Sequence, residues 1–323
     1  MWARRTSAAL VPLACVLAAG CGGSDSGESG TGKQVTLHVG ATPIGDVAPL
    51  YLGIEKGFFK QERLTIEPQP ADVGVAVVAA VVRGSDDVGF GNMTTLTIAV
   101  SKNLPLQIIA PGAQAAARPT RDQAEDALLV KKGSPIASAR DLEGKTVSVN
   151  TLQNIGPLAI NTALRRRGVD YRKVKYIEVP FPDANVALEA GRVDAAFVVE
   201  PYLSQGLDHG SRPLLYPYEE TAPSLPAAAY YANRRFIAEH PDVVDRFVRA
   251  IDTSLDYAQS HPAEVRKIVP TYTKIPPATV RKMKLAQWRS ILPRPAIERM
   301  SRLAREYGYL KKEPDIDELI REP

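Results

Sequence analysis

The chain has 323 residues and a formal charge of +4, with 40 basic and 36 acidic side chains. This near-neutral balance, with one dense basic run at residues 165–167, lacks the strongly basic character of a nucleic-acid-binding protein. The run precedes Gly168 and is typical of a helix C-terminus. Both cysteines, Cys15 and Cys21, lie near the N-terminus, so no disulfide or Cys-ligated metal is expected in the rest of the chain.

The N-terminus has the pattern of an export signal. Arg4 and Arg5 precede an apolar stretch over residues 8–19, which is too short to cross a bilayer but suits the h-region of a signal peptide. The stretch ends in LAAGC at Cys21, which resembles the lipobox of bacterial lipoproteins, although Ala18 stands where that pattern prefers Leu. We predict a lipoprotein signal peptide over residues 1–21 and lipidation of Cys21, with ordinary signal-peptide cleavage as the alternative.

Residues 22–33 contain no apolar side chain that could pack. Their Gly- and Ser-rich composition predicts a flexible tether with a reach of roughly 20 Å. Removing residues 1–21 leaves 38 basic and 36 acidic side chains. We therefore expect an extracytoplasmic protein that is anchored by lipid to the outer face of the cytoplasmic membrane, or is periplasmic.

Strand-like and helix-like segments alternate after the tether. In the first half, strands are predicted at 35–39, 64–66, 88–91 and 106–109, and helices at 49–56, 73–82 and from about 94. In the second half, strands are predicted at 147–149, 174–179 and 195–199, and helices at 157–167 and 184–190. This alternation predicts parallel βαβ units and an α/β fold.

The two halves also match in sequence. Residues 80–90 parallel residues 187–197 at an offset of 107, and both contain a Gly-x-x-Asp step, at Gly84 and at Gly191. Two upstream matches, at offsets of 111 and 112, occur in the same order. We interpret the matches as two lobes of similar build; the alternative is that any two βαβ units share Gly-terminated helices and apolar strands.

The last hundred residues have a helical pattern. A long helix is predicted from Pro241, with one apolar face at helical spacing made by Val244, Phe247, Val248, Ile251, Leu255 and Ala258. Further helices are predicted at 263–269, 277–288 and 296–308.

Taken in order, several segments resemble the substrate-binding proteins of the nitrate, sulfonate and taurine importers, a family that includes thiamine-pyrimidine synthases. The segments are APLY at 48–51, KGFF at 56–59, the Gly84-x-x-Asp87 step, DLEGKTVSV at 141–149, ALEAGRVDAAFVVEPY at 187–202, and 229–258. The resemblance implies a type II periplasmic-binding-protein fold. Lobe one would span 34–120, lobe two with crossover strands 121–225, and residues 226–323 would return to lobe one and add the C-terminal helices.

Ligands of open parallel sheets bind at the carboxyl ends of the strands. The segments after the predicted strands therefore supply the candidate ligand-binding residues, which are Thr42, Ile44, Asn92, Met93, Thr94, Thr95, Thr151, Gln153, Asn154, Glu200 and Tyr202. Asn92, Thr94, Thr95 and Asn154 equally suit helix N-caps. Glu200 also fits a surface acid or an ion pair, and Tyr202 also fits packing between helices.

The function implied is that of a monomeric solute-binding protein that delivers a small molecule to the permease subunits of an ABC importer. The expected solute is a sulfonate, taurine or nitrate-like molecule; the alternative is a pyrimidine or another heterocyclic vitamin precursor. An enzyme on the same fold is less favoured, because the four His are isolated and no G-x-S-x-G motif occurs. The family's synthases also carry a Cys-rich motif, which is absent here. We predict no catalytic residue, cofactor, metal site or nucleic-acid partner.

Overall fold

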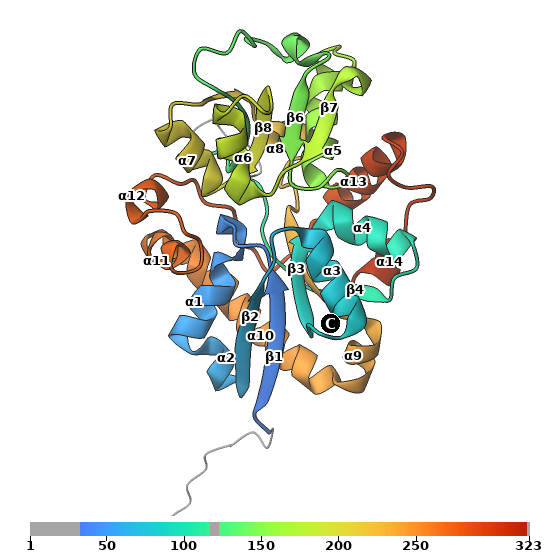
Figure 1. Cartoon of the computed structure of the whole chain (residues 1–323). Helices are drawn as coiled ribbons and strands as arrows, with labels where there is room; N and C mark the ends of the chain where they lie inside the picture. Colours follow the sequence, from blue (N-terminus) through green and yellow to red (C-terminus); the bar gives the residue numbers. More distant parts are fainter. Residues whose placement is uncertain (1–32, 117–122, 322–323) are drawn as a thin grey trace, which may run out of the picture. The chain divides into compact units, whose positions relative to one another are not determined.

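Two five-stranded sheets organise the computed structural model of the chain (Figure 1). The structure describes residues 33–116 and 123–321. The predicted signal peptide, the lipidation site Cys21 and nearly all of the predicted tether lie outside the described residues.

The first sheet has the strand order β2-β1-β3-β10-β4. Strands β1, β2 and β3 run parallel, and β10 is antiparallel to both of its neighbours. Strand β10 thus enters the sheet from a distant part of the sequence. The bounds are β1 Val35–Ala41, β2 Leu64–Pro70, β3 Val88–Asn92, β4 Leu106–Pro111 and β10 Ala228–Asn233.

The second sheet repeats this topology with the order β7-β6-β8-β5-β9. Strand β6 is parallel to β7 and β8, and β5 is antiparallel to β8 and β9. Each sheet therefore receives one antiparallel strand from the crossing between the lobes. The bounds are β5 Asp126–Val130, β6 Thr146–Val149, β7 Lys175–Glu178, β8 Ala195–Val199 and β9 Arg212–Leu215.

The repeated Gly-x-x-Asp step ends a helix and binds a strand backbone in the same way in both lobes. Gly84 and Gly191 end the preceding helices with φ of 77° and 68°, a left-handed conformation that favours glycine. Three residues later, the carboxylate of Asp87 accepts the backbone N–H of His38 in β1 at 2.8 Å. The carboxylate of Asp194 accepts the N–H of Thr146 in β6 at the same distance. The motif thus fastens β1 to β3 in the first lobe and β6 to β8 in the second.

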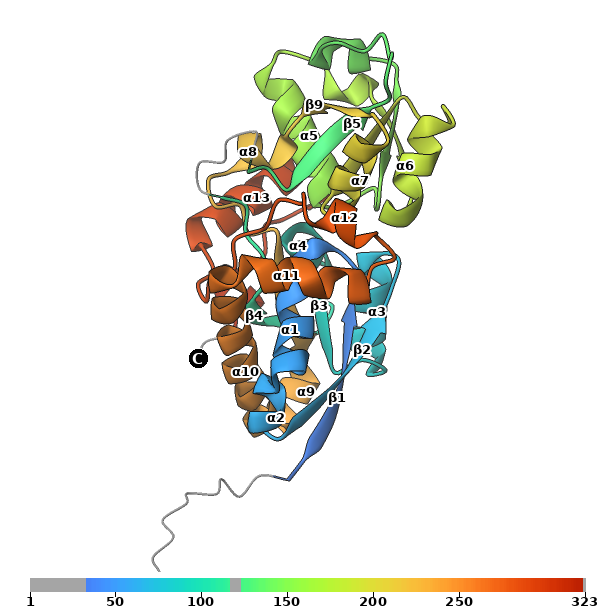
Figure 2. The ribbon, with the colours of Figure 1, turned by 90° about the vertical axis from the view of Figure 1, so that its left-hand side faces the viewer.

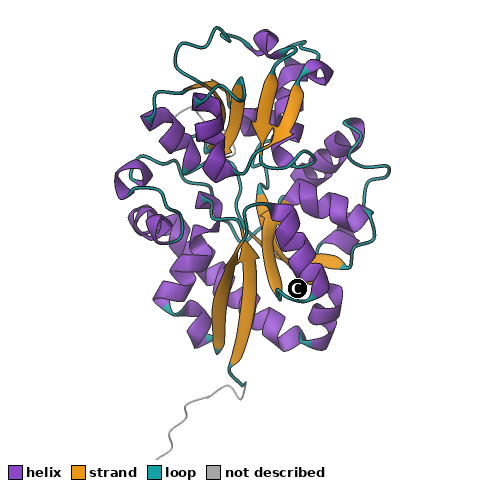
Figure 3. Ribbon diagram, in the orientation of Figure 1, coloured by secondary structure: helices purple, strands orange, loops and turns teal. Residues whose placement is uncertain are grey.

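Helices pack on both faces of each sheet (Figures 2 and 3). None of the helices among residues 33–116 and 123–321 has the length and apolar character needed to cross a membrane. The bounds are α1 Ala48–Lys56, α2 Phe58–Gln61, α3 Gly74–Arg83, α4 Met93–Ser101, α5 Ile155–Arg166, α6 Phe181–Glu189, α7 Tyr202–Asp208, α8 Pro217–Thr221, α9 Arg234–Glu239, α10 Pro241–Ser260, α11 Pro262–Ile268, α12 Pro277–Val280, α13 Arg294–Glu306 and α14 Ile316–Leu319.

The long helix α10 buries its predicted apolar face, with only Val248 left partly buried. Phe247 is fully buried and contacts the rings of Phe59 and Tyr230 at centroid distances of 5.7 and 5.6 Å. Helix α1 packs closely against α10 at Gly53. A Cβ added at this glycine would lie only 2.1 Å from Oγ of Ser254, so a larger residue would not fit. This contact holds α1, and with it the end of β1, in place.

Three chain segments meet where the chain passes between the lobes. Gln114 and Gln287 exchange two backbone hydrogen bonds, of 2.9 and 2.8 Å. On its other side Gln114 forms an antiparallel bridge to Pro226, and Ala115 donates to the carbonyl of Leu225 at 2.9 Å. The C-terminal segment therefore adds a third strand-like segment to the two crossovers.

The predicted helix at 277–288 is wrong beyond residue 280, where α12 ends. The backbone N–H groups of Lys284, Gln287 and Trp288 instead donate to Glu200, Gln114 and Gln259. These tertiary bonds satisfy the backbone as well as helical bonds would, so the local helical pattern is overridden.

Helix α13 packs against α4 of the first lobe and α5 of the second. Its Leu303 belongs to a small buried cluster with Ile98 of α4 and Leu158 of α5. An ion pair between Arg165 of α5 and Glu306 strengthens the contact with the second lobe. The C-terminal helices, expected to belong to the first lobe, thus contact both lobes.

Leu303→Ala is expected to lower the free energy of unfolding by about 2–4 kcal/mol, because it opens a cavity in this cluster. Urea denaturation followed by circular dichroism measures the change. Leu207→Ala is the control, since Leu207 is 42% exposed, and it should change stability by less than about 0.5 kcal/mol. Equal effects of the two substitutions would contradict the assignment of α13 to the core.

Candidate ligand-binding site

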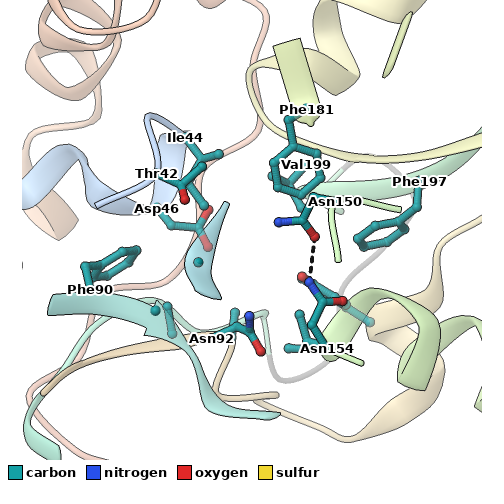
Figure 4. Close-up of a pocket in the computed structure, with 16 residues that line it drawn as sticks. Thr42, Ile44, Asp46, Phe90, Asn92, Asn150, Asn154, Phe181, Phe197 and Val199 are labelled. Carbon is teal, nitrogen blue, oxygen red and sulfur yellow. Dashed lines mark hydrogen bonds between the residues drawn. The ribbon is translucent and has the colours of Figure 1, made fainter. Parts of the chain in front are cut away.

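A cleft lies between the carboxyl ends of the two sheets, as expected for open parallel sheets. Its empty space is about 510 Å³, a volume that includes the opening to solvent. The first lobe contributes the loop after β1, the end of β3 and the start of α3 (Figure 4). The second lobe contributes the end of β6, the starts of α5 and α6, β8 and α8. The lining residues are Thr42, Ile44, Asp46, Gly74, Phe90, Gly91, Asn92, Asn150, Asn154, Ile155, Phe181, Phe197, Val199, Tyr218, Ala227 and Ala228.

Two asparagines cap the helices that begin at the cleft. The side chain of Asn92 accepts the backbone N–H of Thr95 at 2.9 Å, at the start of α4. Asn154 accepts the N–H of Gly156 at 2.9 Å, at the start of α5, and donates to Oδ1 of Asn150 at 2.6 Å. Capping fixes both amides, so each lobe contributes a preformed polar edge to the cleft.

Aromatic side chains form much of the wall. Phe90 comes from the first lobe, and Phe181, Phe197 and Tyr218 come from the second. Phe197 packs against Tyr218 at a centroid distance of 5.8 Å, and Phe181 packs against Tyr202 at 6.1 Å. The lining residues that the structure describes include no Lys, Arg or His. Such a wall suits a flat, largely apolar ligand with a few polar groups.

Asp46 is the acidic member of the lining. It lies in a 3-10 turn directly after β1, and the indole N–H of Trp288 holds that turn by donating to the backbone carbonyl of Asp46 at 3.0 Å. The residue is 6% exposed, and burial raises the pKa of its carboxyl group to about 7, although its own backbone N–H donates to it. Figure 4 shows the carboxyl group pointing into the cleft.

Four of the eleven residues predicted from the sequence line the cleft. These are Thr42, Ile44, Asn92 and Asn154. The first turn of α4 buries Met93, Thr94 and Thr95. Ligand contact by any of the eleven stays a prediction.

The remaining predicted residues of the second lobe lie outside the cleft lining. Thr151 is buried and donates its hydroxyl to the carbonyl of Asn150 at 2.8 Å. Gln153 is exposed. Tyr202 donates its hydroxyl to the carbonyl of Pro43 at 3.3 Å, so it joins the two lobes beside the cleft.

Glu200 is a second buried acid, but its carboxyl group has partners. It accepts the backbone N–H and the hydroxyl of Ser204 at 3.0 and 2.9 Å, and the backbone N–H of Lys284 at 2.9 Å. Burial raises its pKa to about 7 in spite of these bonds. Its backbone carbonyl accepts the N–H of Gly45 at 2.8 Å, across the two lobes. Glu200 thus joins α7, the C-terminal segment and the loop after β1.

The predicted residues did not include Asp46 or the aromatic residues of the wall. Asn150 begins the predicted segment 150–156 but was not singled out as a ligand-binding residue. Asp46 follows β1, and Asn150 follows β6, the corresponding strand of the second lobe. This position after a strand was the available signal. Phe90 and Phe197 carried no such signal, because they lie within apolar strands that are typical of a core.

Comparison with solved structures of other proteins identifies the fold. The fold is that of the substrate-binding proteins of ABC importers. A ligand-binding component of an ABC-type import system from Staphylococcus aureus, solved with zinc bound, superposes with a TM-score of 0.77 at 14% identity, over 89% of this chain and 97% of that one. The alkanesulfonate-binding protein from Xanthomonas axonopodis pv. citri, bound to MOPS, gives a TM-score of 0.72 at 19% identity, over 87% and 96%. The predicted fold class is thereby confirmed.

The chain belongs to the NMT1/THI5-like family, whose model matches residues 45–265. It is 27% identical over 234 residues to a 4-amino-5-hydroxymethyl-2-methylpyrimidine phosphate synthase of Candida albicans. The alignment covers 67% of this chain and 64% of the synthase. It is 23% identical over 231 residues to a formylaminopyrimidine-binding protein of Halalkalibacterium halodurans, over 69% and 65%. The chain therefore matches slightly less than two thirds of the length of these relatives.

Asp46→Asn is expected to stabilise the ligand-free protein increasingly as pH rises. The folded-state pKa of Asp46 is raised, so the wild type loses stability between about pH 4, where unfolded Asp ionises, and the folded-state value of about 7. Asn carries no charge and escapes this loss. The gain should approach zero near pH 4 and reach up to about 4 kcal/mol at pH 8. Thermal unfolding across this pH range measures the gain. A gain independent of pH would contradict a buried carboxyl group without a counter-charge.

Proposed function

We propose that this chain is an extracytoplasmic solute-binding protein that captures a small planar heterocycle of the aminopyrimidine class and delivers it, as a monomer, to an ABC permease. The fold and the family support solute binding for import. The cleft supports the choice of solute. The proposal thus selects the heterocyclic alternative over the sulfonate, taurine or nitrate-like solute expected first.

The observation that carries the proposal is the chemistry of the cleft. Aromatic side chains from both lobes can stack on the faces of a ring. Asn92, Asn150 and Asp46 supply hydrogen-bonding groups for its edge. A sulfonate or nitrate would find helix N-termini to hold its charge, but no basic side chain among the described lining residues. The ionised carboxylate of Asp46 in the same cleft would repel it.

Two relatives support the same class of ligand. The synthase of Candida albicans and the binding protein of Halalkalibacterium halodurans are both named for substituted pyrimidines. We propose binding without turnover, because residues 22–323 contain no Cys and so lack the Cys-rich motif expected of a synthase.

A panel of 4-aminopyrimidines, nitrate, taurine and alkanesulfonates tests the proposal by thermal shift and calorimetry. An aminopyrimidine at 100 times its Kd should stabilise the protein by about 2.7 kcal/mol, and mass spectrometry should detect no new product. Phe181→Ala should weaken binding about tenfold, whereas Val186→Ala on the same helix, with Val186 55% exposed, should leave the affinity unchanged. Selective stabilisation by nitrate or a sulfonate would refute the heterocyclic solute, and product formation would favour an enzyme.

We also propose that Cys21 carries the lipid that anchors the protein outside the cell. In a bacterial host the wild-type chain should enter the detergent phase on Triton X-114 partition and incorporate a labelled fatty acid. Cys21→Ser should remain in the aqueous phase, because it has no thiol to acylate. Release of an unacylated wild-type protein into the medium would contradict the anchor and support ordinary cleavage.

A further inference from the structure

The carboxyl group of Asp46 has no counter-charge in the described part of the chain. The titratable groups whose pKa values respond to its charge are acids or phenols. They reach it from the start of β5, from α8, from β10 and from the segment after α11, and they are Glu125, Asp126, Tyr218, Tyr230 and Tyr272.

Glu125 is a second buried acid close enough to Asp46 for their charges to interact. It is 4% exposed, and neither of its carboxyl oxygens has a hydrogen-bond partner among the described residues. Burial raises its pKa well above the ordinary value, and the charges of Asp46, Asp126 and Glu200 raise it further. Both effects favour the neutral form of Glu125. Asp46 is the acid that lines the cleft itself.

A buried carboxyl group whose donor is only its own backbone N–H costs stability unless a ligand supplies a further partner. No cluster of three or more metal-ligating side chains occurs among residues 33–116 and 123–321. The aromatic wall beside Asp46 indicates instead a flat organic ligand, with an edge that matches a carboxyl group.

We propose that Asp46 is the residue that determines solute specificity, by pairing with an amino group and the adjacent ring nitrogen of the heterocycle so that the pair holds one proton. This inference rests on the proposed function and deepens it. The amino group donates to one carboxyl oxygen. The shared proton lies between the other oxygen and the ring nitrogen, so either a neutral acid meets a neutral ring, or a carboxylate meets a protonated ring.

The proton count makes the affinity depend on pH in both directions. At low pH both partners carry a proton, and two donors face each other. At high pH both are deprotonated, and the lone pair of the ring nitrogen faces a carboxylate. The affinity should therefore pass through a maximum, with its alkaline side near the pKa of Asp46, about 7.

Isothermal titration calorimetry from pH 5 to pH 9 tests this with two probes, 4-amino-2-methylpyrimidine and its 4-oxo analogue. Wild-type protein should bind the amino probe at least about tenfold more tightly at the optimum. Asp46→Asn should lose both this preference and the pH optimum. Asp86→Asn is the matched control, because Asp86 is also a buried acid with a raised pKa but lines a separate pocket beside α3 and α9; it should keep both.

The outcomes separate the two proposals. Equal binding of the amino probe by wild type and Asp46→Asn, with the same pH profile, overturns the role of Asp46 and leaves the heterocyclic solute standing. Equal affinity of wild type for the amino and oxo probes also overturns it alone. Failure of both ring probes to bind the wild type overturns the inference together with the proposed function. Asp46→Ser, which also removes the charge, replaces Asp46→Asn if that variant does not fold.

Discussion

The backbone of Gln114 is paired on both sides, with Pro226 in one crossover and with Gln287 in the C-terminal segment. This three-segment pairing lies where the chain passes between the sheets, and the rest of the architecture depends on it. It places β5 and β10 as the antiparallel strand of each sheet. It also brings Trp288 under the turn that carries Asp46. The position of the cleft acid is therefore set by residues more than two hundred positions apart in the sequence.

Much of the fold could be predicted from sequence because the two lobes repeat one local device. A glycine in the left-handed conformation ends a helix, and an aspartate three residues later binds the backbone of the neighbouring strand. This device appears in the sequence as a spaced pair, and the strands around it have clear apolar patterns. Strands β5 and β9 were not predicted. These strands are defined by pairing with segments from elsewhere in the chain. Their own sequences show no local hydrophobic period that predicts a strand.

The site could be predicted only in outline. Strand ends pointed to Thr42, Asn92 and Asn154, but burial and partners decide what each side chain does. Glu200 and Asp46 are both buried acids after strands, yet Glu200 has three donors and joins elements, whereas Asp46 has only its own backbone N–H. Two of the three donors come from Ser204 in α7, and the third is the backbone N–H of Lys284, in a segment where a helix was predicted.

Helix α13 has a consequence for how solutes exchange. Its Leu303 shares a buried cluster with Ile98 and Leu158, so moving α4 away from α5 would expose that apolar surface to water at a cost in free energy. A rotation that keeps this seam closed, and separates the starts of α3 and α6 instead, avoids that cost. The contact of α13 with α4 and α5 would then act as the hinge between the lobes. Such a rotation would open the cleft on the side that α3 and α6 border, and the packing of α13 would limit its extent.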